Sequence, residues 1–83
     1  MNNDDFIFNY NKLRGKIVEK FGKQEEFAKA VGISYVSLSK RLNNHLDFSV
    51  REILKMCGLL EIDLKDIPIY FFTTKVQKHE QIA

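Results

Sequence analysis

The chain has 83 residues, of which 45% are hydrophobic, and it carries a formal net charge of +2. This length predicts a single domain, and the apolar fraction is sufficient for one core. The lone Cys57 excludes an intramolecular disulfide, and no cysteines and histidines stand at metal-ligand spacing, so we expect no metal and no cofactor. No segment approaches the roughly twenty apolar residues of a membrane span, and the acidic N-terminus is unlike a signal peptide. A reducing cytoplasm is the expected location.

Residues 1–10 predict a loose N-terminal arm, and a helix follows it. Asn11 can cap this helix, because an asparagine side chain accepts a hydrogen bond from a free amide of the first turn. Leu13, Ile17 and Phe21 recur every four residues and predict its buried stripe. Its cations are expected to be exposed; they are Lys12, Arg14, Lys16 and Lys20.

Two short helices joined by one glycine are predicted next. Gly32 ends the first, because glycine adopts the left-handed conformation of a helix end without steric penalty. Ser34 can cap the second, which runs from about Tyr35 to Leu42. Apolar residues at helical spacing predict that both helices bury one face. These residues are Phe27, Ala28, Val31, Leu38 and Leu42.

The opposite face of the second helix is short, polar and basic. Val36, Ser39, Lys40 and Asn43 lie on it, and residues 35–44 contain no carboxylate. Small hydroxyls and cations suit a groove whose walls are phosphates. The alternative is a solvated helix of a small bundle.

The basic residues are concentrated in the same half of the chain. Residues 12–41 hold eight Lys or Arg against three Glu, whereas the segments on either side are slightly acidic. A modest basic bias is common on protein surfaces, but its coincidence with the paired helices favours a nucleic-acid partner.

A fourth helix is predicted to open at Ser49 and Glu52, whose spacing is that of a capping box. Its inner side would hold Ile53, Met56 and Cys57, and Gly58 is expected to end it. Asp63 can then cap a final short helix, residues 64–67.

Pro68 is expected to stop that last helix, since the residue before a proline is biased away from helical geometry. Residues 69–76 are dense in β-branched and aromatic side chains and predict a strand or extended arm. Such a strand must pair with the N-terminal arm, fold onto the helices or pair with a second subunit. We favour the second subunit, with intrachain packing as the alternative. Dimerisation would then use Tyr70, Phe71 and Phe72, and the polar tail from Gln77 is expected to fray.

One family shares the order of these residues. The series Gln24, Ala28, Gly32, Ile33, Ser34, Ser37, Leu38, Leu42, Asn43 resembles the helix-turn-helix of the phage Cro and repressor family, also called lambda-repressor-like or XRE-type domains. The resemblance covers residues 11–67 and implies that they form an all-α, five-helix DNA-binding domain. It also implies that the third helix enters the major groove, usually as a homodimer on two half-sites. Residues 68–83 are expected to follow this domain as the C-terminal strand or arm and tail.

The resemblance also implies roles for individual residues. Tyr35, Val36 and Lys40 match positions that commonly reach base edges, and Ser39 shares their face. Gln24 matches a glutamine that bonds a phosphate, and Asn43 a phosphate contact at the end of the third helix. The full set of candidate phosphate contacts is Gln24, Lys23, Ser34, Ser37, Asn43, Asn44, Lys12 and Lys16. Lys23 and Asn44 depart from the Ser or Thr and the Gly that the family often has at these places.

Two functions of different classes follow. The first is a sequence-specific transcriptional regulator of a phage or mobile element that binds a double-stranded operator as a homodimer. The second is a protein-binding module, an anti-repressor or co-regulator that acts through a partner repressor and uses the aromatic C-terminal arm. An enzyme is not expected, because the sequence offers no Gly-rich phosphate loop, and the adjacent Glu25 and Glu26 face different directions on their helix.

Overall fold

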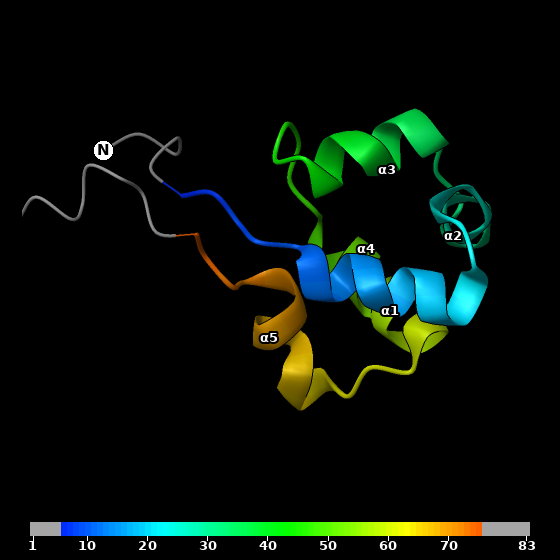
Figure 1. Ribbon diagram of the computed structural model, residues 1–83. Helices are drawn as coiled ribbons and strands as arrows, with labels where there is room; N and C mark the ends of the chain where they lie inside the picture. The colour runs from blue at the N-terminus through cyan, green and yellow to red at the C-terminus, as the bar shows by residue number, and fades with distance from the viewer. Residues whose placement is uncertain (1–5, 76–83) are drawn as a thin grey trace, which may run out of the picture.

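The computed structural model describes residues 6–75, which form five α-helices and one short 3₁₀ turn (Figure 1). The helices are α1 (Asn11–Phe21), α2 (Gln24–Val31), α3 (Tyr35–Leu42), α4 (Val50–Leu60) and α5 (Ile67–Phe71), with the 3₁₀ turn η2 (Leu64–Asp66) before the last. Residues 6–75 contain no strand beyond an isolated bridge, so the predicted all-α class with five helices is confirmed for this part of the chain. None of these helices is long and apolar enough to cross a membrane.

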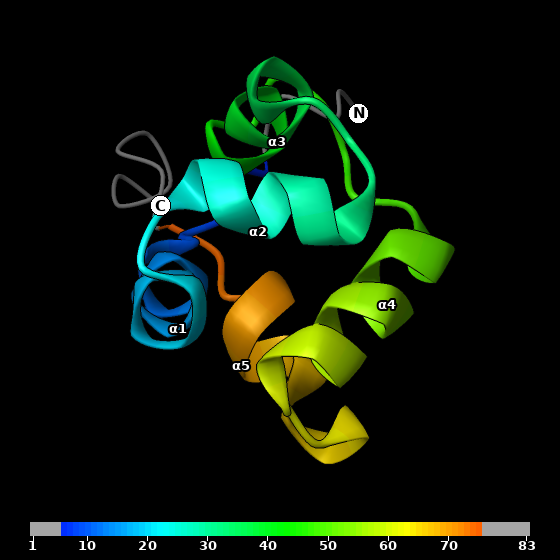
Figure 2. The same ribbon diagram turned by 90° about the vertical axis from the view of Figure 1, so that its right-hand side faces the viewer.

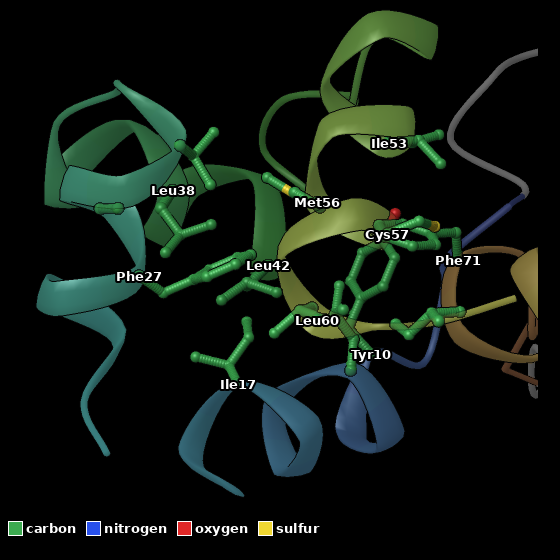
Figure 3. Packing of buried hydrophobic residues seen from close by; sticks show 14 residues of the cluster. Tyr10, Ile17, Phe27, Leu38, Leu42, Ile53, Met56, Cys57, Leu60 and Phe71 are labelled. Carbon is green, nitrogen blue, oxygen red and sulfur yellow. The ribbon is translucent and has the colours of Figure 1, made fainter. Parts of the chain in front are cut away.

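One hydrophobic core joins all five helices. Ile17 of α1, Phe27 of α2, and Met56 and Leu60 of α4 lie together in this core (Figure 3). Leu13 of α1 belongs to the same cluster. Each of these five side chains is completely buried. The predicted inward residues of the paired helices and of α4 are all buried, which confirms the helical periodicity on which they were based.

Helix α2 lies between α3 and the rest of the bundle (Figure 2). It packs against α1, α3 and α4, whereas α3 has its main helix contact with α2 alone. Leu38 and Leu42 fill that contact, with 0% and 2% of their surface exposed. Within residues 6–75, no other helix therefore covers the side of α3 that faces away from α2, which we call the free face of α3.

Local caps set most of the helix boundaries. Gly32 ends α2 at φ 94°, in the left-handed region. The Ser34 hydroxyl accepts a hydrogen bond from the Ser37 amide at 3.0 Å and opens α3. Ser49 and Glu52 form the predicted capping box at the start of α4. These predictions are confirmed.

The predicted start of α1 and the predicted end of α4 are wrong. Asn11 is the first residue of α1 rather than its cap, and its amide donates to the side-chain oxygen of Asn9 at 2.9 Å. Gly58 does not end α4, which continues to Leu60 and turns at Glu61 with φ 58°. Burial of Leu60 contributes about 2 kcal/mol, which exceeds the roughly 1 kcal/mol that a glycine costs within a helix.

The segment after η2 corrects the prediction of a strand. Residues 69–71 are helical, because α5 runs from Ile67 to Phe71 and buries Phe71 in the core. Pro68 lies in the first turn of α5, where an amide proton is not needed, so it helps to start this helix and does not stop the preceding one. The expected boundary between residues 67 and 68 consequently falls inside α5.

Beyond α5 the chain pairs with the N-terminal arm. Phe8 and Thr74 form an antiparallel bridge, in which the Asn9 amide donates to the Thr73 carbonyl at 2.7 Å and the Lys75 amide to the Ile7 carbonyl at 2.8 Å. The two segments run side by side in Figure 1. Among the described residues, this segment thus pairs with the N-terminal arm of the same chain and not with a second subunit, which was the favoured arrangement. Residues 1–5 and the predicted tail from Gln77 lie outside the described part.

Candidate nucleic-acid interface

Three of the four candidate base-reading residues share the free face of α3. Tyr35 and Val36 in its first turn are 47% and 61% exposed, and Lys40 follows one turn later, also exposed. The fourth, Ser39, is half-buried, and its hydroxyl accepts a hydrogen bond from the Asn43 amide nitrogen at 3.3 Å. The free face is therefore composed of one aromatic, one aliphatic and one cationic side chain.

Several candidate phosphate contacts are engaged within the protein. The Ser34 hydroxyl caps α3, and the Ser37 hydroxyl accepts a hydrogen bond from the Arg41 guanidinium. The side chain of Asn43 accepts from the Arg14 guanidinium at 3.0 Å and donates to the Ser39 carbonyl at 2.9 Å. The same Arg14 group donates to the Leu42 carbonyl at 2.8 Å. Arg14 was predicted to be an exposed cation, but it is hydrogen-bonded to the last turn of α3.

Asn44 joins the end of α3 to the N-terminal arm. Its side-chain oxygen accepts from the Phe8 amide at 2.8 Å, and its side-chain nitrogen donates to the Phe8 carbonyl at 3.0 Å. The residue has φ 66°, a left-handed conformation that asparagine tolerates better than most residues. Sequence reasoning missed this contact, because Phe8 and Asn44 are 36 residues apart in the chain. The only local hint was that asparagine tolerates a left-handed backbone conformation.

Lys23 and Gln24 lie at the start of α2, close to the free face of α3. Lys23 is exposed at the N-cap position without a side-chain cap bond, and Gln24 is half-buried. A shallow groove joins this end of α2 to Tyr35 and carries both signs of charge. The charged residues of its lining are Lys23, Glu25, Glu26 and Lys29, and Lys29 pairs with Glu26 at 3.5 Å.

The two candidate phosphate contacts on α1 have neighbours of their own. The Lys12 ammonium lies over the Tyr70 ring of α5, 5.6 Å from its centroid, which is within cation–π distance. The Lys16 ammonium lies 3.6 Å from the Glu19 carboxylate. Lys12 is thus directed toward α5.

Arg41, one of the eight basic residues between positions 12 and 41, forms a clamp between α3 and α4. Its guanidinium donates to both carboxylate oxygens of Glu52, at 2.9 and 3.0 Å, and to the Ser37 carbonyl at 3.0 Å. Burial would raise the pKa of the Glu52 carboxyl, but the hydrogen bond from the Ser49 amide and the charge of Arg41 outweigh it and lower the pKa. Sequence reasoning missed this clamp, because the partners stand on different helices.

The predicted dimer residues differ in their exposure. Phe71 is 1% exposed and belongs to the core of the protomer, whereas Tyr70 is half-buried and Phe72 is 51% exposed. A contact between subunits at this place remains a prediction, and in this conformation Tyr70 and Phe72 would supply it.

Comparison with known proteins relates the chain to a family model and to a solved structure. The family model described as "Protein of unknown function (DUF739)" matches residues 6–74. The solution structure of the modulator of repression (MOR) of the temperate bacteriophage TP901-1 from Lactococcus lactis is 44% identical to this chain, with a TM-score of 0.73. The match covers 84% of this chain and 95% of that one. No curated protein matches the chain.

The phage relative agrees with the sequence-based expectation of a small helical phage regulator, and its name describes a regulator and not an enzyme. That name mentions neither the Cro and repressor family nor DNA, so those two assignments remain predictions. The match across nearly all described residues shows that this chain belongs to the DUF739 family.

Proposed function

We propose that the protein is a cytoplasmic regulator of a phage-type repression switch and that it acts by binding a repressor protein through the free face of α3. The exposure of Tyr35 and Val36 on that face is the observation that carries the proposal. Tyrosine is among the residues enriched at the energetic centres of protein interfaces, and an adjacent exposed valine adds apolar area. The 44% identical phage relative is named as a modulator of repression, which supports the same role.

The cations around α3 also favour a protein partner. Within residues 23–42, Lys23 and Lys40 are the cations that make no ion pair, since Arg41 is held by Glu52 and Lys29 by Glu26. A protein that binds duplex DNA tightly neutralises about 6–10 phosphates, and these two cations alone correspond to a salt slope of only about 2. Glu25 and Glu26 beside them would repel a phosphate backbone.

Direct binding of operator DNA is the second candidate, and the arrangement of α2 and α3 favours it. The two helices are joined through Gly32 and Ser34, and α3 presents Lys40 on a face that no other described element covers. This is the placement that a helix-turn-helix needs to enter the major groove. A homodimer on two half-sites would double the number of available cations.

One pair of binding assays separates the two candidates. The chain is titrated into the repressor encoded by the genome that carries its gene, and separately used to select duplexes from a random DNA pool at about 150 mM salt. We expect complex formation with the repressor and no enriched DNA motif. Val36→Asp should abolish the complex, because it places a charge in the apolar centre of the interface. Val50→Asp is the matched control, since Val50 is also well exposed but lies on a different helix.

An enriched motif would favour the second candidate. In that case Lys40→Ala should weaken binding and change the preference at one base pair, whereas Gln24→Ala should weaken all sequences about equally. A repressor complex that is insensitive to Val36→Asp would contradict the assignment of α3 as the binding surface.

A further inference from the structure

A second recessed site lies where the two terminal segments meet the start of α4. It is a half-open pocket of about 270 Å³ lined by Phe8, Tyr10, Asp47, Phe48, Ile53, Phe71 and Phe72. Five of these seven side chains are aromatic, and Asp47 is the charged member. The volume is below the range of about 300–1,000 Å³ that holds a small-molecule ligand, and it suits one large side chain.

The aromatic rings form a continuous chain around the pocket. Phe72 meets Phe8 at 6.1 Å between centroids, Phe8 meets Tyr10 at 5.9 Å, Tyr10 meets Phe48 at 5.2 Å, and Phe48 meets Phe71 at 5.4 Å. Figure 3 shows Tyr10 extending from the start of α1 toward Ile53 and Phe71 at this end of the core. Aromatic rings have electron-rich faces, which attract cations within about 6 Å.

Two oxygen-bearing groups add to this negative potential. Burial raises the pKa of the Tyr10 phenol, and the negative charge of nearby Asp47 raises it further. Among residues 6–75, the phenol oxygen has no hydrogen-bond partner, and it is not sealed from solvent. The Asp47 carboxylate is exposed and forms no ion pair with any described residue. Among the described residues, no Lys or Arg lines the pocket itself, and the cations Arg14 and Lys75 line the adjoining groove that shares Asp47.

We propose that this pocket receives an arginine side chain of the partner protein. A guanidinium is planar, so it can lie against aromatic rings while its N–H groups bond to the Asp47 carboxylate and the Tyr10 oxygen. An anionic group is disfavoured by Asp47, and a purely aliphatic side chain would leave the carboxylate and the phenol without a partner. Lysine offers a compact charge without the flat surface that stacks on rings.

The pocket is continuous with the surface already assigned to the partner. Phe8 and Asp47 also line the larger groove beside the end of α3, together with Leu42, Asn43 and Asn44. A protein that covers the free face of α3 can therefore extend along this groove and place a side chain in the pocket. The inference rests on the proposed function for the identity of the partner, but the chemistry of the pocket can be tested without it.

The test uses ethylguanidinium as the probe and ethylurea as its uncharged counterpart of nearly the same shape. Each is titrated to tens of millimolar into the ¹⁵N-labelled full chain, and amide chemical shifts are followed. We expect saturable shifts at Tyr10, Asp47, Phe48 and Phe72 with ethylguanidinium, and binding weaker by about threefold to fivefold with ethylurea. Asp47→Asn, which preserves the shape of the side chain, should weaken ethylguanidinium by a similar factor. Asp63→Asn is the matched control, because Asp63 is exposed and its side chain makes no cap bond.

The results that overturn the proposal are equally specific. Equal shifts with ethylurea, or unchanged binding in Asp47→Asn, would show an apolar pocket that does not select a cation. Tighter binding of ethylammonium would assign the pocket to lysine, and the absence of saturable shifts would remove the site. A failure here leaves repressor binding by α3 untouched, since that is judged by Val36→Asp. If Asp47→Asn weakens both repressor binding and ethylguanidinium binding, the repressor itself places a side chain in the pocket.

Discussion

Replacing Glu52 by alanine is expected to destabilise the protein by about 2–4 kcal/mol. The carboxylate has two structural tasks, for it completes the capping box of α4 and accepts two hydrogen bonds from Arg41. A cap contributes about 1 kcal/mol, and hydrogen bonds to a charged group contribute about 1.5–3 kcal/mol. The side chains of Arg41 and Glu52 are only 16% and 21% exposed, so solvent screens the pair weakly. For a chain of this size, the loss corresponds to a decrease in Tm of roughly 10–25 °C.

Urea unfolding, followed by the helical circular dichroism signal, measures the loss in unfolding free energy. Variants of Ser49 and Arg41 separate the contribution of the cap from that of the ion pair. Ser49→Ala should cost about 1 kcal/mol, because it removes the cap hydroxyl and leaves the ion pair. A double-mutant cycle of Arg41→Ala with Glu52→Ala should give a coupling energy above about 1 kcal/mol. A coupling energy near zero would refute the reasoning, since the pair would then be an ordinary solvated surface contact.

The same clamp predicts how stability depends on pH. The folded-state pKa of Glu52 is lowered below its ordinary value of 4.5, so its contribution is fully present above that value and decreases as the pH falls through the folded pKa. The difference in unfolding free energy between the wild type and Glu52→Gln should accordingly be largest near pH 7. It should shrink steadily below pH 4.5. A difference that grows on acidification would contradict the sign of the shift.

Three further changes test other features of the fold. Gly58→Ala should stabilise the protein by about 0.5–1 kcal/mol in thermal unfolding, because Gly58 is helical and a Cβ would meet nothing within 4 Å; a lower Tm would show a contact that the structure lacks. Gly32→Ala should destabilise it by about 1–2 kcal/mol, since φ 94° strains any residue with a Cβ, and an unchanged Tm would contradict that backbone conformation. Asn44→Ala should increase the rate of amide hydrogen exchange at Phe8, Asn9 and Lys75 about tenfold, which corresponds to about 1.4 kcal/mol. The amides of α1 should keep their protection. A uniform loss of protection would instead indicate global destabilisation.

The paired helices were predictable because several local signals agree there. Gly32 as a stop, Ser34 as a cap and the spacing of Phe27, Val31 and Leu38 all point to the same two helices. The exposure of Val36 and Lys40 follows from that spacing as well. This is why α2, α3 and the free face of α3 agree with the sequence analysis.

The misplaced elements are those in which a local signal has two meanings. Pro68 is compatible with the end of one helix and with the first turn of the next, and Gly58 with a helix end or a tolerated interior position. The β-branched and aromatic residues at 69–72 have strand propensity, yet burial of Phe71 against the core decides for a helix. Propensities of a few tenths of a kcal/mol do not compete with about 2–3 kcal/mol from a buried aromatic ring.

The candidate site was harder to predict because its polar side chains have distant partners. Asn44 bonds to Phe8, and Arg41 bonds to Glu52 on another helix. Spacing along a helix places a side chain on a face, but it does not reveal which groups the tertiary fold brings to that face. The number of free cations at α3, which bears directly on the choice between DNA and protein, could be counted in the structure alone.

The bridge between the arm and the segment after α5 has a consequence for the order in which a newly synthesised chain matures. Ile7 and Asn9 precede all five helices in the chain, but they pair with Thr73 and Lys75, which follow the last helix. Four helices can dock while translation continues, because α1, α2, α3 and α4 are complete by Leu60. The arm, and with it the hydrogen bonds that Asn44 makes at the end of α3, must wait for the C-terminal segment to emerge. The end of α3 at Asn44 therefore reaches its final form only after α5 and the segment that follows it have been synthesised.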